Sequence, residues 1–416
     1  MKPRTFPSGW TAWLVVFVAL GSLVSAADSN DSEPNQWTFG ATVDARLRYE
    51  TVDDDAVPDN ANATTLRTRL AFSAARLRFG ALLEFEDVSP VGSERFNDTA
   101  NGRANFAVVA DPEATEVNRA WVSFAAPRAI HLRLGRQIVN RDRGRILGHV
   151  GWRQNQQTFD AVTAERKKGK FHFWSGYLIR ANRIFGDQHP NPVRRQFDLD
   201  AWVGEGAAHL GPGTLTGMLH YLEFDNDPTR SHRNLGLRWV GSHALDDGRR
   251  IKYRAEWIDQ GSYANGAASN DAEYVAVEAG YETGRWGVGA NLEQLGGDGV
   301  YGFQRPLATL HAYNGWADRF LNTPAGGLVD LYVDARLSIG GYVLKSQYHD
   351  FDADTGSLHY GSELGLAVSR KFLKRYEVML KYAGHNADDV GADVHKIWLS
   401  VRVLEKFKLR RDKPAG

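Results

Sequence analysis

Polar and apolar residues alternate one by one in many segments of this 416-residue chain. Between Trp37 and Tyr49 every second residue is apolar, and the residues between them include Asp44, Arg46 and Arg48. A period of two indicates a β-strand whose two faces meet different surroundings. Strands that regularly place charges on one face and aliphatic or aromatic residues on the other are typical of a transmembrane β-barrel with a water-filled interior.

Further segments repeat this alternation, at residues 66–73, 76–86, 251–257, 329–337, 376–382 and 397–403. Counting all such segments gives about eighteen strands, and bacterial single-chain barrels have an even number. The links between them alternate in length: short ones lie near 75–76, 126–128, 167–169, 282–284, 340–341 and 372–374, and longer ones at 52–64, 89–117, 141–156, 182–195 and 296–327. We therefore predict an all-β fold, a single transmembrane antiparallel barrel with short periplasmic turns and long extracellular loops.

The first residues have the composition of a secretory signal peptide. Two basic residues precede an apolar run at residues 10–24, which ends in small residues and is followed by a polar stretch. A transmembrane helix needs about 20 apolar residues, so this run is too short for an anchor. We predict cleavage near Ala26, with residues 1–26 as the signal peptide and residues 27–416 as the barrel, located in the outer membrane of a Gram-negative cell.

Composition excludes several kinds of chemistry. The chain has no cysteine, so it has neither disulfides nor thiolate metal sites. Lys+Arg and Asp+Glu both number 50, so no polyanion-coating surface follows from net charge. No zinc spacing of the His-Glu-x-x-His kind and no Gly-x-Ser-x-Gly elbow occurs. We predict a protein that is not an enzyme, with no cofactor, no metal site and no nucleic-acid partner.

Five segments carry distinctive combinations of residues: Ala45–Glu50, Leu66–Leu70, Leu134–Gln137, Gly151–Gln154 and Phe159-Asp160. Together these segments resemble the alginate-export family of outer-membrane proteins. The resemblance implies an eighteen-stranded, alginate exporter-like porin with an arginine-rich, anion-selective pore. Two features depart from the founding exporter of the family: the link at Phe372–Arg375 is too short for its long periplasmic plug, and the chain continues past Phe407 instead of ending on an aromatic residue.

The inward faces of the early strands carry a series of basic residues, with acids interleaved. The candidate pore-lining residues are Arg46, Arg48, Arg67, Arg69, Arg76, Arg78, Arg119 and Arg133, together with Asp44 and Glu84. Guanidinium groups bind carboxylates through two parallel hydrogen bonds, and rings of basic residues select anions in pores. The alternative is that these arginines only pair with neighbouring acids and brace the barrel wall.

One long link contains Arg141, Arg143 and Arg145 within five residues. This segment either folds inward as a constriction or binds lipopolysaccharide phosphates outside, since both roles use the same guanidinium geometry. The link at 296–327 is rich in aromatic residues, which we expect to form a small core of that loop.

Three functions remain open from the sequence. The first is export or diffusion of an anionic, alginate-like saccharide through an arginine-lined lumen. The second is uptake of small carboxylates or other nutrients, and the third is a closed barrel whose loops serve adhesion or a lipid role. The partners expected are outer-membrane lipid and lipopolysaccharide, the anionic solute, and periplasmic secretion proteins.

Overall fold

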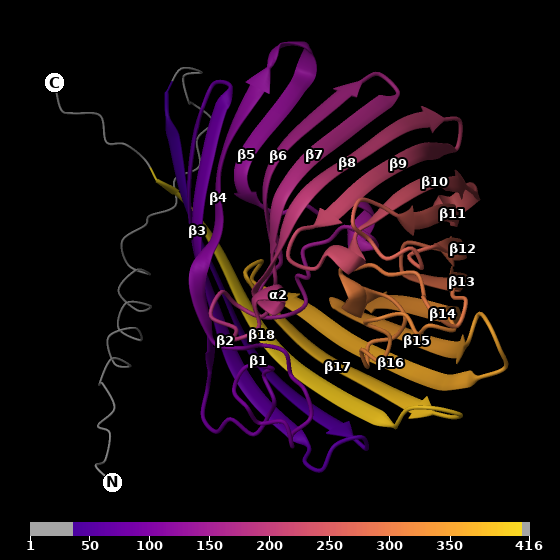
Figure 1. Cartoon of the computed structure of the whole chain (residues 1–416). Coiled ribbons are helices and arrows are strands. Elements are labelled where there is room, and N and C mark those ends of the chain that lie inside the picture. The colour runs from indigo at the N-terminus through magenta and orange to yellow at the C-terminus, as the bar shows by residue number, and fades with distance from the viewer. Residues whose placement is uncertain (1–35, 410–416) are drawn as a thin grey trace, which may run out of the picture.

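The structure, a computed structural model, describes residues 36–409, which form one sheet of 18 antiparallel strands. Each strand pairs with its neighbours in sequence, and β1 (Thr38–Asp54) also pairs with β18 (Val394–Leu409), which closes the ring (Figure 1). The predicted eighteen-stranded antiparallel barrel is confirmed. The predicted signal peptide, residues 1–26, lies outside the described residues.

The remaining strands are β2 (Ala61–Arg76), β3 (Phe79–Pro90), β4 (Ala114–Ala126), β5 (Ile130–Gln137), β6 (Thr158–Lys168), β7 (Phe171–Asn182), β8 (Gln196–Leu210), β9 (Gly213–Phe224), β10 (His232–Ala244), β11 (Arg250–Ser262), β12 (Ala272–Glu282), β13 (Trp286–Leu295), β14 (Leu328–Ile339), β15 (Tyr342–Asp352), β16 (His359–Phe372) and β17 (Tyr376–Ala387). The helical turns are α2 (Pro192–Arg195), η2 (Pro127–Ala129), η3 (Asp142–Gly144), η4 (Pro228–Arg230), η5 (Asp246–Gly248) and η6 (Leu310–Ala312). Within residues 36–409 no helix is long and apolar enough to cross a membrane.

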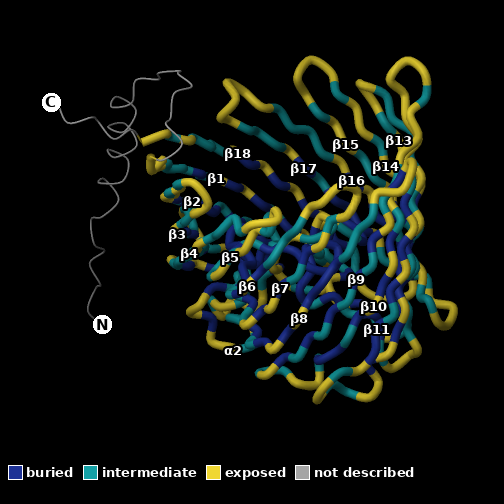
Figure 2. Tube along the Cα trace, turned by 90° about the horizontal axis from the view of Figure 1, so that it is seen from above, coloured by how far each residue is buried: buried dark blue, intermediate teal, exposed yellow. Residues whose placement is uncertain are grey.

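The two faces of the sheet differ as the alternation predicts. On β1, Arg46 and Arg48 are buried toward the lumen, whereas Leu47 and Tyr49 are exposed on the outer wall. Burial is concentrated in the interior and exposure at the turns (Figure 2). Polar groups are therefore buried inside and large apolar groups face outward, the reverse of a soluble protein.

Turns and loops follow the predicted alternation of lengths with two local differences. The predicted link at 52–64 shortens to residues 55–60, because β1 and β2 stay paired as far as Val52 and Ala61. The strand β3 begins only at Phe79, so Arg78 lies in a turn rather than on an inward strand face.

Two long extracellular loops, residues 138–157 and residues 296–327, turn back into the barrel. They meet there through backbone hydrogen bonds: the Gly148 N–H donates to the Leu307 carbonyl at 2.8 Å, and the Thr309 N–H to the Gly144 carbonyl at 2.7 Å. Gly144 has a φ of +86°, and a Cβ there would lie 2.5 Å from the Thr309 hydroxyl oxygen. Glycine is therefore required for this close approach. Segments of these loops lie within the ring in Figure 1.

Candidate functional site in the barrel lumen

The arginines of β1 hold the second half of the 138–157 loop. The Arg46 Nε donates to the Gln154 side-chain oxygen at 2.8 Å, and the same guanidinium donates to the carbonyl of Arg153. Arg48 donates to the Trp152 carbonyl at 2.6 Å, and its guanidinium lies 4.3 Å from the centre of the Trp152 ring. The predicted arginines of β1 thus face the lumen, where both donate hydrogen bonds to neutral groups of a loop about a hundred residues away, and Arg48 also lies 3.6 Å from the carboxylate of Asp111.

Other candidate arginines on this side pair with carboxylates of adjacent strands. Arg67 contacts Asp44 at 2.9 Å, Arg69 pairs with Glu86, and Arg119 pairs with Glu84. A bulge at Asn118 lets β4 present both Asn118 and Arg119 to Glu84. These three arginines therefore have carboxylate partners within the wall.

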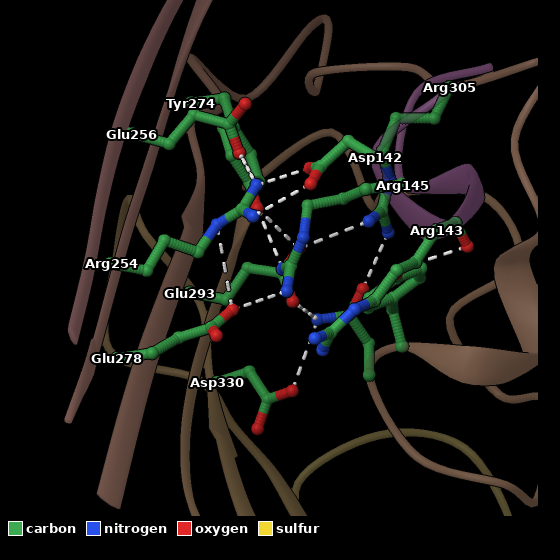
Figure 3. Close-up of polar contacts among 12 residues, drawn as sticks. Asp142, Arg143, Arg145, Arg254, Glu256, Tyr274, Glu278, Glu293, Arg305 and Asp330 are labelled. Atoms are coloured by element: carbon green, nitrogen blue, oxygen red, sulfur yellow. Dashed lines mark hydrogen bonds and ion pairs between the residues drawn. The ribbon is translucent and has the colours of Figure 1, made fainter. Parts of the chain in front are cut away.

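On the opposite side, the first half of the 138–157 loop carries cations that pair with acids of the wall. Arg141 contacts Glu205 of β8 at 2.9 Å. Arg145 is buried and contacts Glu278 of β12 at 2.5 Å and Glu293 of β13 at 3.0 Å. Figure 3 shows Arg145 between these carboxylates. The structure therefore places Arg141 and Arg145 inside the barrel.

Asp142 of the same loop is an acid that pairs with cations of the wall. It accepts hydrogen bonds from Arg254 of β11, one of them at 2.9 Å (Figure 3), and lies 3.4 Å from Arg238 of β10. Burial would raise the pKa of Asp142, but the hydrogen bond from Arg254 and the charges of Arg238 and Arg254 outweigh it and lower the pKa to about 2. Asp142 is thus ionised at any physiological pH.

The three remaining candidates are more exposed. Arg143 has an exposed side chain, while its carbonyl accepts a hydrogen bond from the Tyr313 hydroxyl at 3.3 Å. Arg76 is half-buried at the end of β2, and Arg78 is exposed in the turn that follows.

A lumenal cavity of about 500 Å³ lies between the 138–157 loop and the wall of β2 to β7. Arg133 of β5 lines it, opposite Ser123 and Thr163 in the strand register. Its guanidinium stacks on the Trp121 ring at 4.4 Å. Its Nε is buried without a hydrogen-bond partner, and no carboxylate within residues 36–409 forms an ion pair with it. Arg133 is therefore a lumenal cation whose charge is available to a solute.

Sequence reasoning missed the aromatic and acidic parts of this site. Arg141 stacks on the ring of Trp174, 4.7 Å away, in the same cavity. The acids that hold the loop, Glu205, Glu278 and Glu293, are spread over strands whose alternation was visible. The alternation of these strands indicates that the three acids face inward. It does not indicate that all three bind the same loop.

A comparison with protein-family models identifies the relatives of this chain. The model described as alginate export matches residues 35–291, more than half of the sequence. The chain belongs to the alginate export family. No curated protein matches it in a sequence search.

Solved structures share its architecture. Acinetobacter baumannii OccAB4 superposes with a TM-score of 0.71 over 90% of this chain and 100% of its own, at 13% identity. Pseudomonas aeruginosa OccK9 (OpdG) gives 0.70 over 89% and 98%, at 14% identity. Pseudomonas aeruginosa OpdK, solved with vanillate, gives 0.67 over 88% and 99%, at 13% identity. At such low identity these likenesses establish the fold. Together with the family, they identify an integral outer-membrane barrel of the porin type, a channel rather than an enzyme fold.

Proposed function

We propose that this alginate-export family barrel passes carboxylate-bearing saccharides passively, with a preference for anions. The observation that carries the proposal is the cavity at Arg133, where a guanidinium without a carboxylate partner faces a lumenal space beside two indole rings. A guanidinium can bind a carboxylate through two parallel hydrogen bonds. The Trp121 and Trp174 side chains add apolar surface beside it, which suits the ring of a sugar acid.

The charge balance of the lumen supports the same proposal. Several lumenal acids on the wall have polar partners, for example Glu293 with Arg305 at 3.1 Å and Asp330 with His349 at 2.8 Å. By contrast, Arg336 and Lys345 face each other across β14 and β15 with exposed side chains, and neither forms an ion pair within the described part of the chain. These two cations add positive charge to the lumen, which favours anions.

A second candidate function is uptake of small carboxylates. Two loops cross the lumen here and pack on each other, which leaves less room for a polymer than an open barrel would. The similar OpdK barrel was solved with vanillate, a small aromatic carboxylate. Solute size therefore separates the two candidates.

Flux into proteoliposomes tests both. We expect galacturonate to enter faster than galactose, and Arg133→Gln to slow galacturonate about tenfold while leaving galactose unchanged, as loss of a charge-assisted hydrogen bond predicts. The control is Arg180→Gln, since Arg180 pairs with Asp198 on the outer wall. Passage of a galacturonate trimer would favour the exporter, and passage of monomers alone would favour the uptake channel. Equal rates for galacturonate and galactose in the wild type and in Arg133→Gln would contradict anion preference. No flux at all would indicate a closed barrel whose loops serve adhesion or a lipid role.

A further inference from the structure

The outer wall of the barrel contains a recess of about 680 Å³ across β6 to β11. Its floor consists of small outward-facing residues in two neighbouring rows of the strand register. One row contains Ala164, Ser175 and Gly204, and the other Gly206 and Gly217. Outward positions elsewhere on this wall hold large apolar side chains, so these small residues leave a hollow on the surface that faces the membrane.

Aromatic and aliphatic side chains form the rim of the recess. Phe173, Trp202, Leu237 and Trp257 line it and are each exposed by 39% to 55%. A Cβ on Gly204 would lie 2.9 Å from the Trp202 ring, so the glycine allows the indole to lie flat against the backbone. Small residues on the floor and apolar side chains on the rim thus form a hollow whose lining suits a hydrocarbon chain.

One end of the recess is basic. Arg166 faces outward near the periplasmic end of β6, between Ile130 and Phe173 in the register, and lines the recess. Its Nε is buried and has no hydrogen-bond partner. Lys168 and Lys170 follow at the β6–β7 turn. In the described residues none of these three cations forms an ion pair with a carboxylate.

We propose that this recess binds an anionic phospholipid of the periplasmic leaflet, with an acyl chain in the hollow and the phosphate at Arg166. Arginine matches phosphate geometry through paired hydrogen bonds, and basic residues at a membrane surface attract anionic lipids. An outward arginine near the interface otherwise has only water and lipid headgroups to satisfy it. A second copy packed through the same face would bring the like charges of Arg166, Lys168 and Lys170 together, which opposes a symmetric contact here. The proposal does not depend on which solute crosses the lumen.

The barrel provides an internal comparison. A second outer recess of about 600 Å³ lies across β13 to β17 and is lined by outward residues such as Trp286, Leu337, Leu366 and Tyr382. The cations among its lining residues, such as Lys381, belong to the alternate register positions that face the lumen. This second recess offers a similar volume without an outward charge, so it should hold lipid without preference for an anionic headgroup.

Native mass spectrometry of the full chain, released from nonionic detergent with added phosphatidylglycerol or phosphatidylethanolamine of identical acyl chains, tests the proposal. We expect one phosphatidylglycerol to bind preferentially, and Arg166→Gln to weaken it about fivefold while phosphatidylethanolamine is unaffected. Gly217→Leu should weaken both lipids, because it fills the hollow and a Cβ there meets only Leu237 at 3.8 Å. The matched control is Ala335→Leu in the second recess, which should leave the phosphatidylglycerol preference intact.

Two outcomes would overturn the proposal. One is equal retention of the two lipids by the unmodified protein and by Arg166→Gln. The other is an oligomer without bound lipid that dissociates in Gly217→Leu, which would show that a second copy fills the recess. Heat-modifiable migration on gels, a property of folded barrels, checks that each variant is folded before binding is compared.

Discussion

The two sides of the lumen hold one loop in different ways. Toward β8 to β13, Arg141 and Arg145 of the loop form ion pairs with wall carboxylates. Toward β1, the wall supplies the cations, and Arg46 donates to neutral oxygens of Gln154 and Arg153. The same loop is therefore fixed on both sides, by ion pairs with carboxylates on the first and by hydrogen bonds from Arg46 to neutral acceptors on the second.

Loss of Arg145 should have the largest effect. Arg145→Met removes one partner of Glu278 and one partner of the buried Glu293, and breaking a buried pair costs about 3–5 kcal/mol. We expect the Gly148 amide, which donates to the Leu307 carbonyl, to exchange with deuterium at least about a hundredfold faster. Hydrogen–deuterium exchange with residue-level resolution measures this.

Arg145→Lys is the matched control for this change. It keeps the positive charge but loses the planar guanidinium group. The exchange rate of the Gly148 amide should therefore lie between the rates in the wild type and in Arg145→Met. Unchanged exchange in Arg145→Met would show that contacts with the 296–327 loop alone hold this part in place.

The equivalent change on the β1 side should have a smaller effect. Arg46→Met removes charge-assisted hydrogen bonds to neutral acceptors, each worth about 1.5–3 kcal/mol. The Gln154 amide, which donates to Asp111 at 2.7 Å, should exchange faster, while the Gly148 amide stays protected. Anion preference should also decrease. A loss of protection at both amides would mean that the two halves of the loop open together.

A pair on the outer wall should contribute little. Arg180 and Asp198 are 3.0 Å apart with side chains exposed by 39% and 37%. Arg180→Gln should change the free energy of unfolding by at most about 1 kcal/mol, as expected of exposed ion pairs. Urea unfolding in lipid vesicles measures it, and a change several times larger would contradict the distinction between lumenal and outer pairs.

Acidification from pH 7 to pH 4 should have the smallest effect on the stability of the loop. The pKa of Asp142 is lowered to about 2 in the folded protein, so its contribution to stability is complete above its ordinary pKa and is lost only as pH falls toward 2. Exchange of the Gly144 amide, which donates to the Arg141 carbonyl beside Asp142, should therefore be unchanged between pH 7 and pH 4 after correction for the intrinsic rate. A transition near pH 5 would show that Asp142 is not held by Arg254.

The sequence predicted the barrel, its turns and the inward direction of Arg46 and Arg48, because a period of two depends only on neighbouring residues. It did not predict that Gly151–Gln154 returns to β1, since that contact joins residues about a hundred positions apart and forms only in the closed ring. Trp121 shares the inward direction of Arg119 two residues before it, but its stacking on Arg133 joins two strands and is not visible in the alternation of either one. From the sequence, the Arg141–Arg145 segment could lie inside the barrel or outside it. The acids that hold it inside belong to strands far away in the sequence, so its position could not be predicted.

We propose that uncompensated lumenal arginine charge, chiefly at Arg133, makes the channel prefer anions. The reversal potential in a planar bilayer under a potassium chloride gradient measures this preference. We expect a potential of the sign for chloride preference, which Arg133→Glu moves toward zero or beyond and Arg180→Glu on the outer wall leaves unchanged. A cation-selective channel, or the same potential in the wild type and Arg133→Glu, would show that Arg133 does not set the selectivity.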